Sequence, residues 1–175
     1  MKINTIFFTG LLFLFFSCRR HQEYNYSEKD YAETERALIG ANRLLLKKDK
    51  ENIIAYIKQH KLDMKESETG LWYRIDKNGH GKTASNGQQI TLKYKVSLLN
   101  GTLCYNSDSL GPKKFTVGRG GVESGLEEGV SMLREGDRAM FIMPPHLAEG
   151  LPGDGDKIPA HSVIIYEVEV LKLEP

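Results

Sequence analysis

Hydrophobic residues change their spacing about a third of the way along the chain, and this change constrains the fold more than any other feature of the sequence. Between Asp30 and His60 they recur every three to four positions with no proline between them, which predicts helix. Asp49 is expected to begin a second, shorter helix as its N-cap. Farther on they alternate with polar residues, which predicts strands. We therefore expect a helical neck over residues 30–66 and a β-rich domain over residues 67–175.

The β-rich part contains one predicted helix among four predicted strands. Ser124 and Glu127 have the spacing of a capping box, which predicts a short helix that begins at Ser124. Asn100-Gly101 predicts a tight turn after the second strand. The strands are predicted at Leu71–Ile75, Ile90–Leu98, Arg138–Met143 and Val163–Leu173. Strands on both sides of a single helix indicate an α+β fold in which an antiparallel sheet wraps around that helix.

The N-terminal segment has the composition of a targeting signal. A basic residue precedes an uncharged apolar run over residues 6–16, which is shorter than the ~20 residues of a transmembrane helix. Ser17-Cys18 ends the run and resembles the processing site of bacterial lipoproteins. This pattern predicts a signal peptide over residues 1–17, lipidation of Cys18 and a polar tether over residues 18–29. An ordinary secretory signal and a short membrane anchor are the alternatives.

Composition excludes several classes of function. The formal net charge of +1 lacks the basic surplus that phosphate binding needs, so no nucleic-acid partner is expected. Two cysteines are too few for a disulfide scaffold or a four-thiolate metal site. If Cys18 is lipidated, Cys104 has no intrachain partner. We expect Cys104 to be a small buried hydrophobe rather than a nucleophile, because no basic residue or histidine stands beside it in the sequence.

Three further motifs fail to support a cofactor or a metal. The glycine-rich segment Gly118–Gly125 lacks the lysine and hydroxyl of a phosphate-binding loop, and acidic residues follow it. Asp154-Gly155-Asp156 lacks the remainder of a calcium loop and is expected to be a solvated turn. His146 and His161 do not have the spacing of paired metal ligands. The sequence therefore predicts no cofactor, no metal and no nucleophilic or acid–base machinery.

Four segments in the second half of the chain follow one another in the order found in a known family. They are Lys93-Tyr94 with Asn100-Gly101, Phe115-Thr116-Val117-Gly118, Gly125-Leu126-Glu127-Glu128-Gly129-Val130, and Ile158-Pro159-Ala160-His161 leading to Tyr166-Glu167-Val168-Glu169-Val170-Leu171. Through them, residues 87–174 resemble the FKBP-type peptidyl-prolyl cis-trans isomerases. The resemblance implies an antiparallel sheet curled around one short helix, and isomerisation of X-Pro bonds without a cofactor. The signal, the neck and Gly70-Leu71-Trp72-Tyr73 resemble exported lipoproteins of this family in Bacteroidetes, including gliding-motility-associated isomerases.

The resemblance also implies a binding cleft, residue by residue. It places catalytic positions at Tyr94, Leu126 and Tyr166, and substrate-binding positions at Cys104, Tyr105, Phe115, Val122, Glu123, Glu149 and Ile158. Plain core packing is the alternative for the aromatic members, and a solvated rim is expected for Glu123 and Glu149. Glu149 replaces a family tyrosine whose hydroxyl donates to ligands, which an ionised carboxylate cannot do. We therefore expect weak or selective isomerase activity and poor binding of macrolide immunosuppressants.

These inferences lead to one main function and two alternatives. The main expectation is a lipid-anchored, periplasm-facing prolyl isomerase that assists the folding of exported, proline-containing polypeptides. The alternatives are a non-catalytic FKBP-fold chaperone or assembly factor, and a structural subunit of an envelope complex that uses the neck as its contact surface. The apolar stripe of the neck is expected to be buried either against its own domain or against a second copy, which would make the protein a homodimer.

Overall fold

The structure is a computed structural model that describes residues 27–76 and 79–175. Residues 39–175 form one compact unit, and the residues up to Leu38 belong to another. The predicted signal peptide and Cys18 lie outside the described residues. Within the described ranges, no helix is both long enough and apolar enough to cross a membrane.

A single helix, α1 (Glu28–Gln59), occupies the region where two were predicted. The Ser27 hydroxyl accepts a hydrogen bond from the backbone N–H of Asp30, and the Asp30 carboxylate accepts one from the backbone N–H of Ser27, so these two residues cap the helix. The prediction that Asp49 is an N-cap is wrong, because Asp49 lies inside the helix with its side chain buried. No proline or glycine follows Gly40 within α1, so nothing in the sequence interrupts the helical hydrogen bonds there.

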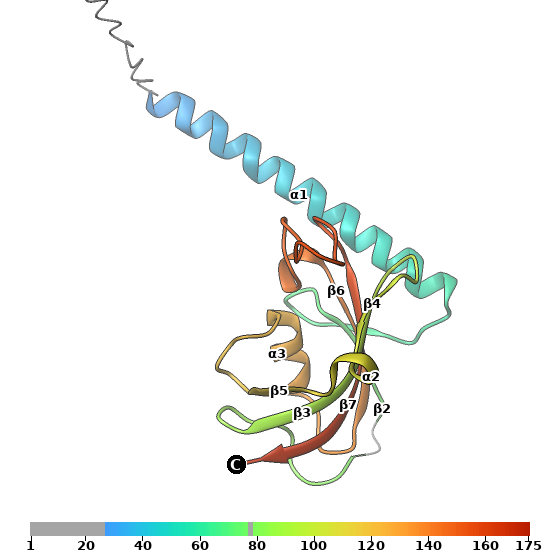
Figure 1. The fold of residues 1–175 in the computed structure, drawn as a ribbon. Coiled ribbons are helices and arrows are strands. Elements are labelled where there is room, and N and C mark those ends of the chain that lie inside the picture. The colour runs from blue at the N-terminus through green and yellow to red at the C-terminus, as the bar shows by residue number, and fades with distance from the viewer. Residues whose placement is uncertain (1–26, 77–78) are drawn as a thin grey trace, which may run out of the picture. The chain divides into compact units, whose positions relative to one another are not determined.

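Seven antiparallel strands form one sheet in the order β1-β2-β6-β7-β3-β4, and β5 also pairs with β3 (Figure 1). Their bounds are Lys65–Glu66 for β1, Trp72–Asp76 for β2, Gln89–Leu98 for β3, Leu103–Asn106 for β4, Lys113–Thr116 for β5, Arg138–Met143 for β6 and Ile164–Glu174 for β7. The four predicted strands are confirmed as β2, β3, β6 and β7. The other three are two to four residues long, which is too short for a clear alternation.

The predicted turn at Asn100-Gly101 is confirmed and joins β3 to β4. Gly101 has a φ of +85°, which a residue with a side chain rarely adopts, and the Asn100 side-chain oxygen accepts a hydrogen bond from the backbone N–H of Thr102 at 3.0 Å. Past β4 the chain forms the short helix α2 (Ser107–Leu110) before β5. This connection places β4 and β5 beside different stretches of β3.

The two faces of the sheet are covered by different helices. Helix α3 (Ser124–Val130) packs through Leu126 and Val130 into the main core, which includes Phe141 of β6 and Tyr166 of β7. The sheet curls around α3 (Figure 1), so the predicted α+β architecture is confirmed. The neighbouring residues Ile142 of β6 and Ile165 of β7 form a second buried cluster with Ile53 of α1 and with Val163. Part of the neck's apolar stripe is therefore buried against its own domain.

The contact between α3 and β6 depends on a glycine. A Cβ atom added to Gly129 would lie 2.6 Å from Cζ of Phe141, and the Phe141 side chain is completely buried. This is closer than any side chain could tolerate without movement of the ring or the helix. Gly129 therefore allows α3 to approach the sheet.

The capping-box prediction at Ser124 is wrong. Glu123 occupies the N-cap position of α3, and its side chain makes no cap hydrogen bond. The Glu127 carboxylate instead accepts hydrogen bonds from the backbone N–H groups of Gly118 at 2.9 Å and Gly120 at 3.0 Å. Both glycines have left-handed φ values, which turns their N–H groups toward the glutamate. Glu127 thus ties the glycine-rich loop to the helix.

Candidate functional site

A cleft of about 300 Å³ lies where β3, β4, β5 and β7 meet the loop before α3 and the loop after the short helix η1 (Pro145–Leu147). Its lining consists of Tyr94, Tyr105, Lys113, Glu123, Glu149, Asp154, Ile158 and Tyr166. The centroids of the Tyr94 and Tyr166 rings are 6.2 Å apart, and the ring planes are inclined by 36°. Two strands of the central sheet therefore supply a continuous aromatic wall.

Tyr166 joins Lys113 and Glu123 in a hydrogen-bonded network within the cleft. Its hydroxyl donates to Glu123 Oε1 at 2.6 Å and accepts from Lys113 Nζ at 2.9 Å. Lys113 Nζ also lies 3.5 Å from Glu123 Oε2, and 5.5 Å and 5.4 Å from the ring centroids of Tyr94 and Tyr166. Burial, reinforced by the charge of Glu123, raises the pKa of Tyr166 far above its ordinary value. The Tyr166 hydroxyl therefore stays protonated, and its single hydrogen remains donated to Glu123.

Glu123 does not lie at a solvated rim, and that expectation is wrong. Its side chain is only 9% exposed, and its carboxylate is held by Lys113 and Tyr166. A buried carboxylate is tolerated when a cation and a hydrogen-bond donor compensate its lost hydration. Within the described part of the chain, no acceptor bonds the backbone N–H of Glu123. That N–H is free to donate to a ligand.

Asp154 organises the loop on the opposite side of the cleft. It accepts hydrogen bonds from the Tyr105 hydroxyl and, through Oδ1, from the backbone N–H groups of Asp156 at 2.9 Å and Ile158 at 2.8 Å. Burial raises the pKa of Asp154, but these hydrogen bonds outweigh it and hold the pKa below its ordinary value. The expected solvated turn is confirmed for Gly155 and Asp156, which are exposed, whereas the half-buried Asp154 uses its carboxylate to hold Tyr105 and Ile158 in place.

Four residues predicted to line the cleft do not belong to its lining. Leu126 and Cys104 are buried in the main core, with 0% and 3% of their surface exposed. Phe115 and Val122 are partly buried and pack against that core. Burial, with a contribution from the charge of Asp154, raises the pKa of the Cys104 thiol. The prediction that Cys104 is a buried hydrophobe is confirmed, and its thiol remains protonated.

Sequence reasoning missed Lys113 and Asp154 as cleft residues. Lys113 stands two positions before Phe115 on β5, so both side chains point to the same face of the strand. This alternation could have identified Lys113 from the sequence. Asp154 could not be identified in that way, because its partner Tyr105 lies 49 positions earlier in the chain.

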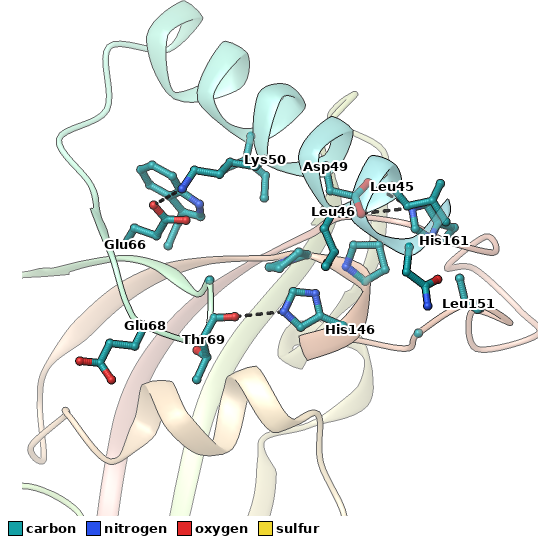
Figure 2. A pocket seen from close by; sticks show the side chains of 17 residues that line it. Leu45, Leu46, Asp49, Lys50, Glu66, Glu68, Thr69, His146, Leu151 and His161 are labelled. Carbon is teal, nitrogen blue, oxygen red and sulfur yellow. Dashed lines mark hydrogen bonds and ion pairs between the residues drawn. The ribbon is translucent and has the colours of Figure 1, made fainter. Parts of the chain in front are cut away.

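A larger groove of about 650 Å³ shares no lining residue with the cleft. It lies between the C-terminal half of α1, the segment around β1 and β2, and η1 (Figure 2). Its apolar lining is formed by Leu45, Leu46, Ile53, Trp72, Pro144, Pro145 and Leu151. His161 Nε2 lies 3.1 Å from the buried Asp49 carboxylate, and Lys50 Nζ lies 2.7 Å from Glu66 Oε2. The sequence did not predict this groove, because its walls come from three distant segments.

Comparison with known proteins identifies the family. The model of the FKBP-type peptidyl-prolyl cis-trans isomerases matches residues 80–171. The chain belongs to this family. The matched region contains every residue of the cleft lining, so the cleft lies in the part of the chain that defines the family.

Curated relatives carry the same family name. A probable FKBP-type peptidyl-prolyl cis-trans isomerase FkpA of Neisseria meningitidis is 34% identical over 144 residues, which cover 81% of this chain and 52% of the relative. The peptidyl-prolyl cis-trans isomerase Fkbp12 of Drosophila melanogaster is 42% identical over 98 residues, covering 55% of this chain and 91% of the relative. The chain thus spans about half the length of the Neisseria protein and nearly all of the Drosophila protein.

Solved structures of the family share the fold. FkpA from Escherichia coli superimposes with a TM-score of 0.62 at 26% identity, and the alignment covers 86% of this chain and 75% of that protein. AtFKBP13 superimposes with a TM-score of 0.59 at 29% identity, covering 63% of this chain and 98% of that protein. The FKBP-like fold expected from the sequence is confirmed.

Proposed function

We propose that this chain is a peptidyl-prolyl cis-trans isomerase that acts on proline-containing polypeptides of the cell envelope. The observation that carries the proposal is the cleft walled by Tyr94 and Tyr166, which lies inside the family-matched residues 80–171. The names of the curated relatives support the same reaction. The cleft is large enough for a proline ring and its neighbouring peptide groups.

The residues of the cleft suit a reaction in which no covalent bond is made or broken. Rotation about an X-Pro bond crosses a barrier of about 18–20 kcal/mol, because twisting destroys the amide resonance. A site that excludes water and holds the twisted peptide lowers this barrier without a nucleophile. The Tyr94 and Tyr166 rings can pack against the proline, while the unbonded N–H of Glu123 can donate to a substrate carbonyl. The protonated thiol of Cys104 has no part in this chemistry.

The test is the rate of cis–trans exchange in a proline-containing peptide, measured by NMR with the full chain purified in a mild detergent. Unaided exchange takes roughly tens to hundreds of seconds. We expect the folded protein to accelerate it in proportion to enzyme concentration. An unchanged exchange rate, with folding verified by circular dichroism, would remove the isomerase proposal.

The apolar groove favours a second candidate, a chaperone that holds unfolded clients without catalysis. Leu46 and Leu151 line the groove, and both are about half exposed or more. Under this alternative, Leu46→Asp would weaken suppression of client aggregation, whereas Tyr94→Ala would not. If Tyr94→Ala slows client refolding and Leu46→Asp leaves it unchanged, catalysis in the cleft is the function that matters.

We also propose that Cys18 is lipidated and anchors the domain at the periplasmic face of a membrane, as in exported lipoproteins of this family in Bacteroidetes. Two or more acyl chains give stable anchoring, since each buried methylene contributes about 0.8 kcal/mol. The test is metabolic labelling with radioactive palmitate in a bacterial host. Labelling that persists in Cys18→Ala would contradict the assignment.

A homodimer through the neck is proposed on the part of α1 that its own domain leaves uncovered. Ile39 and Leu44 expose 51% and 69% of their surface and do not line the groove, in contrast to the buried Ile53. Such exposure on one helix is typical of a surface that meets a partner. Sedimentation velocity of the full chain should show a dimer that Leu44→Lys dissociates, and a monomer at all concentrations would exclude it.

A further inference from the structure

The charges of the cleft are not balanced. Lys113 is the only basic residue of its lining, whereas Glu123, Glu149 and Asp154 supply three carboxylates. Its ammonium group is already engaged, since it lies 2.9 Å from the Tyr166 hydroxyl and 3.5 Å from Glu123 Oε2. The pair Lys113–Glu123 therefore neutralises itself. Within the lining, the carboxylates of Glu149 and Asp154 are left without a cation, and beyond it Lys157 Nζ lies 5.1 Å from the centroid of the Tyr105 ring.

Glu149 differs from the other carboxylates of the cleft because it has no partner. Glu123 is held by Lys113 and Tyr166, and Asp154 by Tyr105 and two backbone N–H groups. Within residues 27–76 and 79–175, no hydrogen bond or ion pair involves the Glu149 side chain, although it is partly buried. The negative charge of this half-buried carboxylate is thus uncompensated by the protein, and a cation placed beside it is attracted more strongly than at a fully exposed site.

The pKa of Glu149 is consistent with a carboxylate that has no partner. Burial raises its pKa, and the negative charges of Glu123 and Asp154 raise it further, while Lys113 opposes the shift only in part. The surroundings of Glu149 thus disfavour its ionised form. A cation placed beside Glu149 would stabilise the ionised form, whereas an anion would destabilise it further.

We infer that the cleft selects proline-containing clients with a lysine or arginine immediately before the proline, and that Glu149 is the residue that receives this cationic side chain. The inference rests on the proposed isomerase function and specifies the substrate class of the same cleft. Because Glu149 and Asp154 both line the cleft, one extended cationic side chain beside a bound proline can approach two carboxylates. An acidic residue at the same position of the client meets uncompensated repulsion.

The test uses three peptides that are identical except for the residue before the proline, which is lysine, norleucine or glutamate. Norleucine has the length of lysine without its charge and so isolates the electrostatic contribution. For the full chain in mild detergent, kcat/KM is measured by NMR exchange and affinity by calorimetry. We expect lysine to exceed norleucine by about fivefold, the upper range for a partly exposed ion pair, and glutamate to fall below norleucine. Raising the salt concentration should reduce both differences.

Two variants assign the preference to its residue. Glu149→Gln should bring the lysine-to-norleucine ratio close to one in both measurements. Glu128→Gln is the matched control, because Glu128 is also a partly buried glutamate but bonds Thr69 outside the cleft. The control should keep the ratio of the unmodified protein. A preference that survives Glu149→Gln, or that disappears equally in Glu128→Gln, overturns the assignment.

The outcomes separate this inference from the function on which it rests. Catalysis of all three peptides at equal rates and with equal affinities overturns the cationic preference and leaves the isomerase intact. If no peptide is isomerised faster, the isomerase proposal fails. The calorimetric ratio then still decides whether the cleft prefers the lysine peptide.

Discussion

Gly129→Ala is the substitution for which the structure gives the most definite prediction. Alanine is the better helix former by about 1 kcal/mol, so propensity alone predicts stabilisation of α3. The added Cβ would lie 2.6 Å from Cζ and 2.8 Å from both Cε atoms of Phe141, however. The Phe141 ring has no room to withdraw, because it is fully buried and its strand pairs with β2 on one side and β7 on the other.

Overpacking costs about 1–3 kcal/mol, and a 2.6 Å contact with a fully buried ring belongs at the upper end, so the net loss of stability should be about 2 kcal/mol after about 1 kcal/mol of helix propensity is subtracted. With a urea m-value of roughly 1–3 kcal/mol/M, a loss of about 2 kcal/mol lowers the unfolding midpoint by about 0.7–2 M at an unchanged slope. The control is Gly40→Ala in α1, where no atom lies within 4 Å of the added Cβ and the midpoint should not fall.

A double variant isolates the cause. Phe141→Leu shortens the side chain that the new methyl group meets, so Gly129→Ala should cost less in that background than in the unmodified protein. The measurement is the urea midpoint of all four proteins, followed by fluorescence and circular dichroism. A Gly129→Ala protein as stable as the original would refute the close packing of α3 on β6.

Three further predictions concern other parts of the domain. Asp137→Ala should destabilise the fold by about 1–3 kcal/mol in urea unfolding, because the buried carboxylate accepts 2.8 Å hydrogen bonds from the N–H groups of Gly79 and Arg134; an unchanged midpoint would contradict this. Tyr166 has a raised pKa in the fold, so stability should hold below pH ~10 and fall above it by about 1.4 kcal/mol per pH unit as unfolded tyrosine ionises. Tyr166→Phe should make that fall less steep, and an identical pH profile would exclude the assignment. If Glu149 stands where the family has a hydroxyl donor, as the resemblance implies, macrolide immunosuppressants should bind poorly by calorimetry, because an ionised carboxylate cannot donate; tight binding would show that the replacement is harmless.

The sequence predicted the parts of the fold that depend on local patterns. The bounds of β6 could be predicted without error because a run of five apolar residues follows Arg138 and Pro144-Pro145 ends it, and Asn100-Gly101 specifies its turn through the conformation that glycine allows. Asp49 was misjudged because its role depends on His161, which is 112 positions away in the chain and 3.1 Å away in space. The general preference of aspartate for N-cap positions is a weak local signal. A partner that the tertiary fold brings close to the side chain outweighs it.

The residues of the site also divide into those that local patterns could place and those that depend on the tertiary fold. Tyr94, Tyr166 and Ile158 could be placed in the cleft by resemblance, because their positions follow from strands and motifs. The network of Lys113 and Glu123 could not, since a glutamate near a helix start is ordinarily solvated. Its burial follows only from the cation and the hydroxyl that β5 and β7 bring to it.

The pairing of β3 with β7 has a consequence for how the chain reaches its native state. Gln89 lies opposite Glu174, and Leu98 lies opposite Ile164, so every contact of this central pair closes a loop of more than sixty residues. Loops of this size are slow to close, and folding rates fall as contacts become less local. β7 lies between β6 and β3 in the sheet, so until β7 has been synthesised each of these strands lacks one of its partners. The nascent chain therefore cannot complete its sheet before its last strand is made. A polypeptide proposed to cross a membrane would thereby remain unfolded long enough to be threaded through a translocation channel.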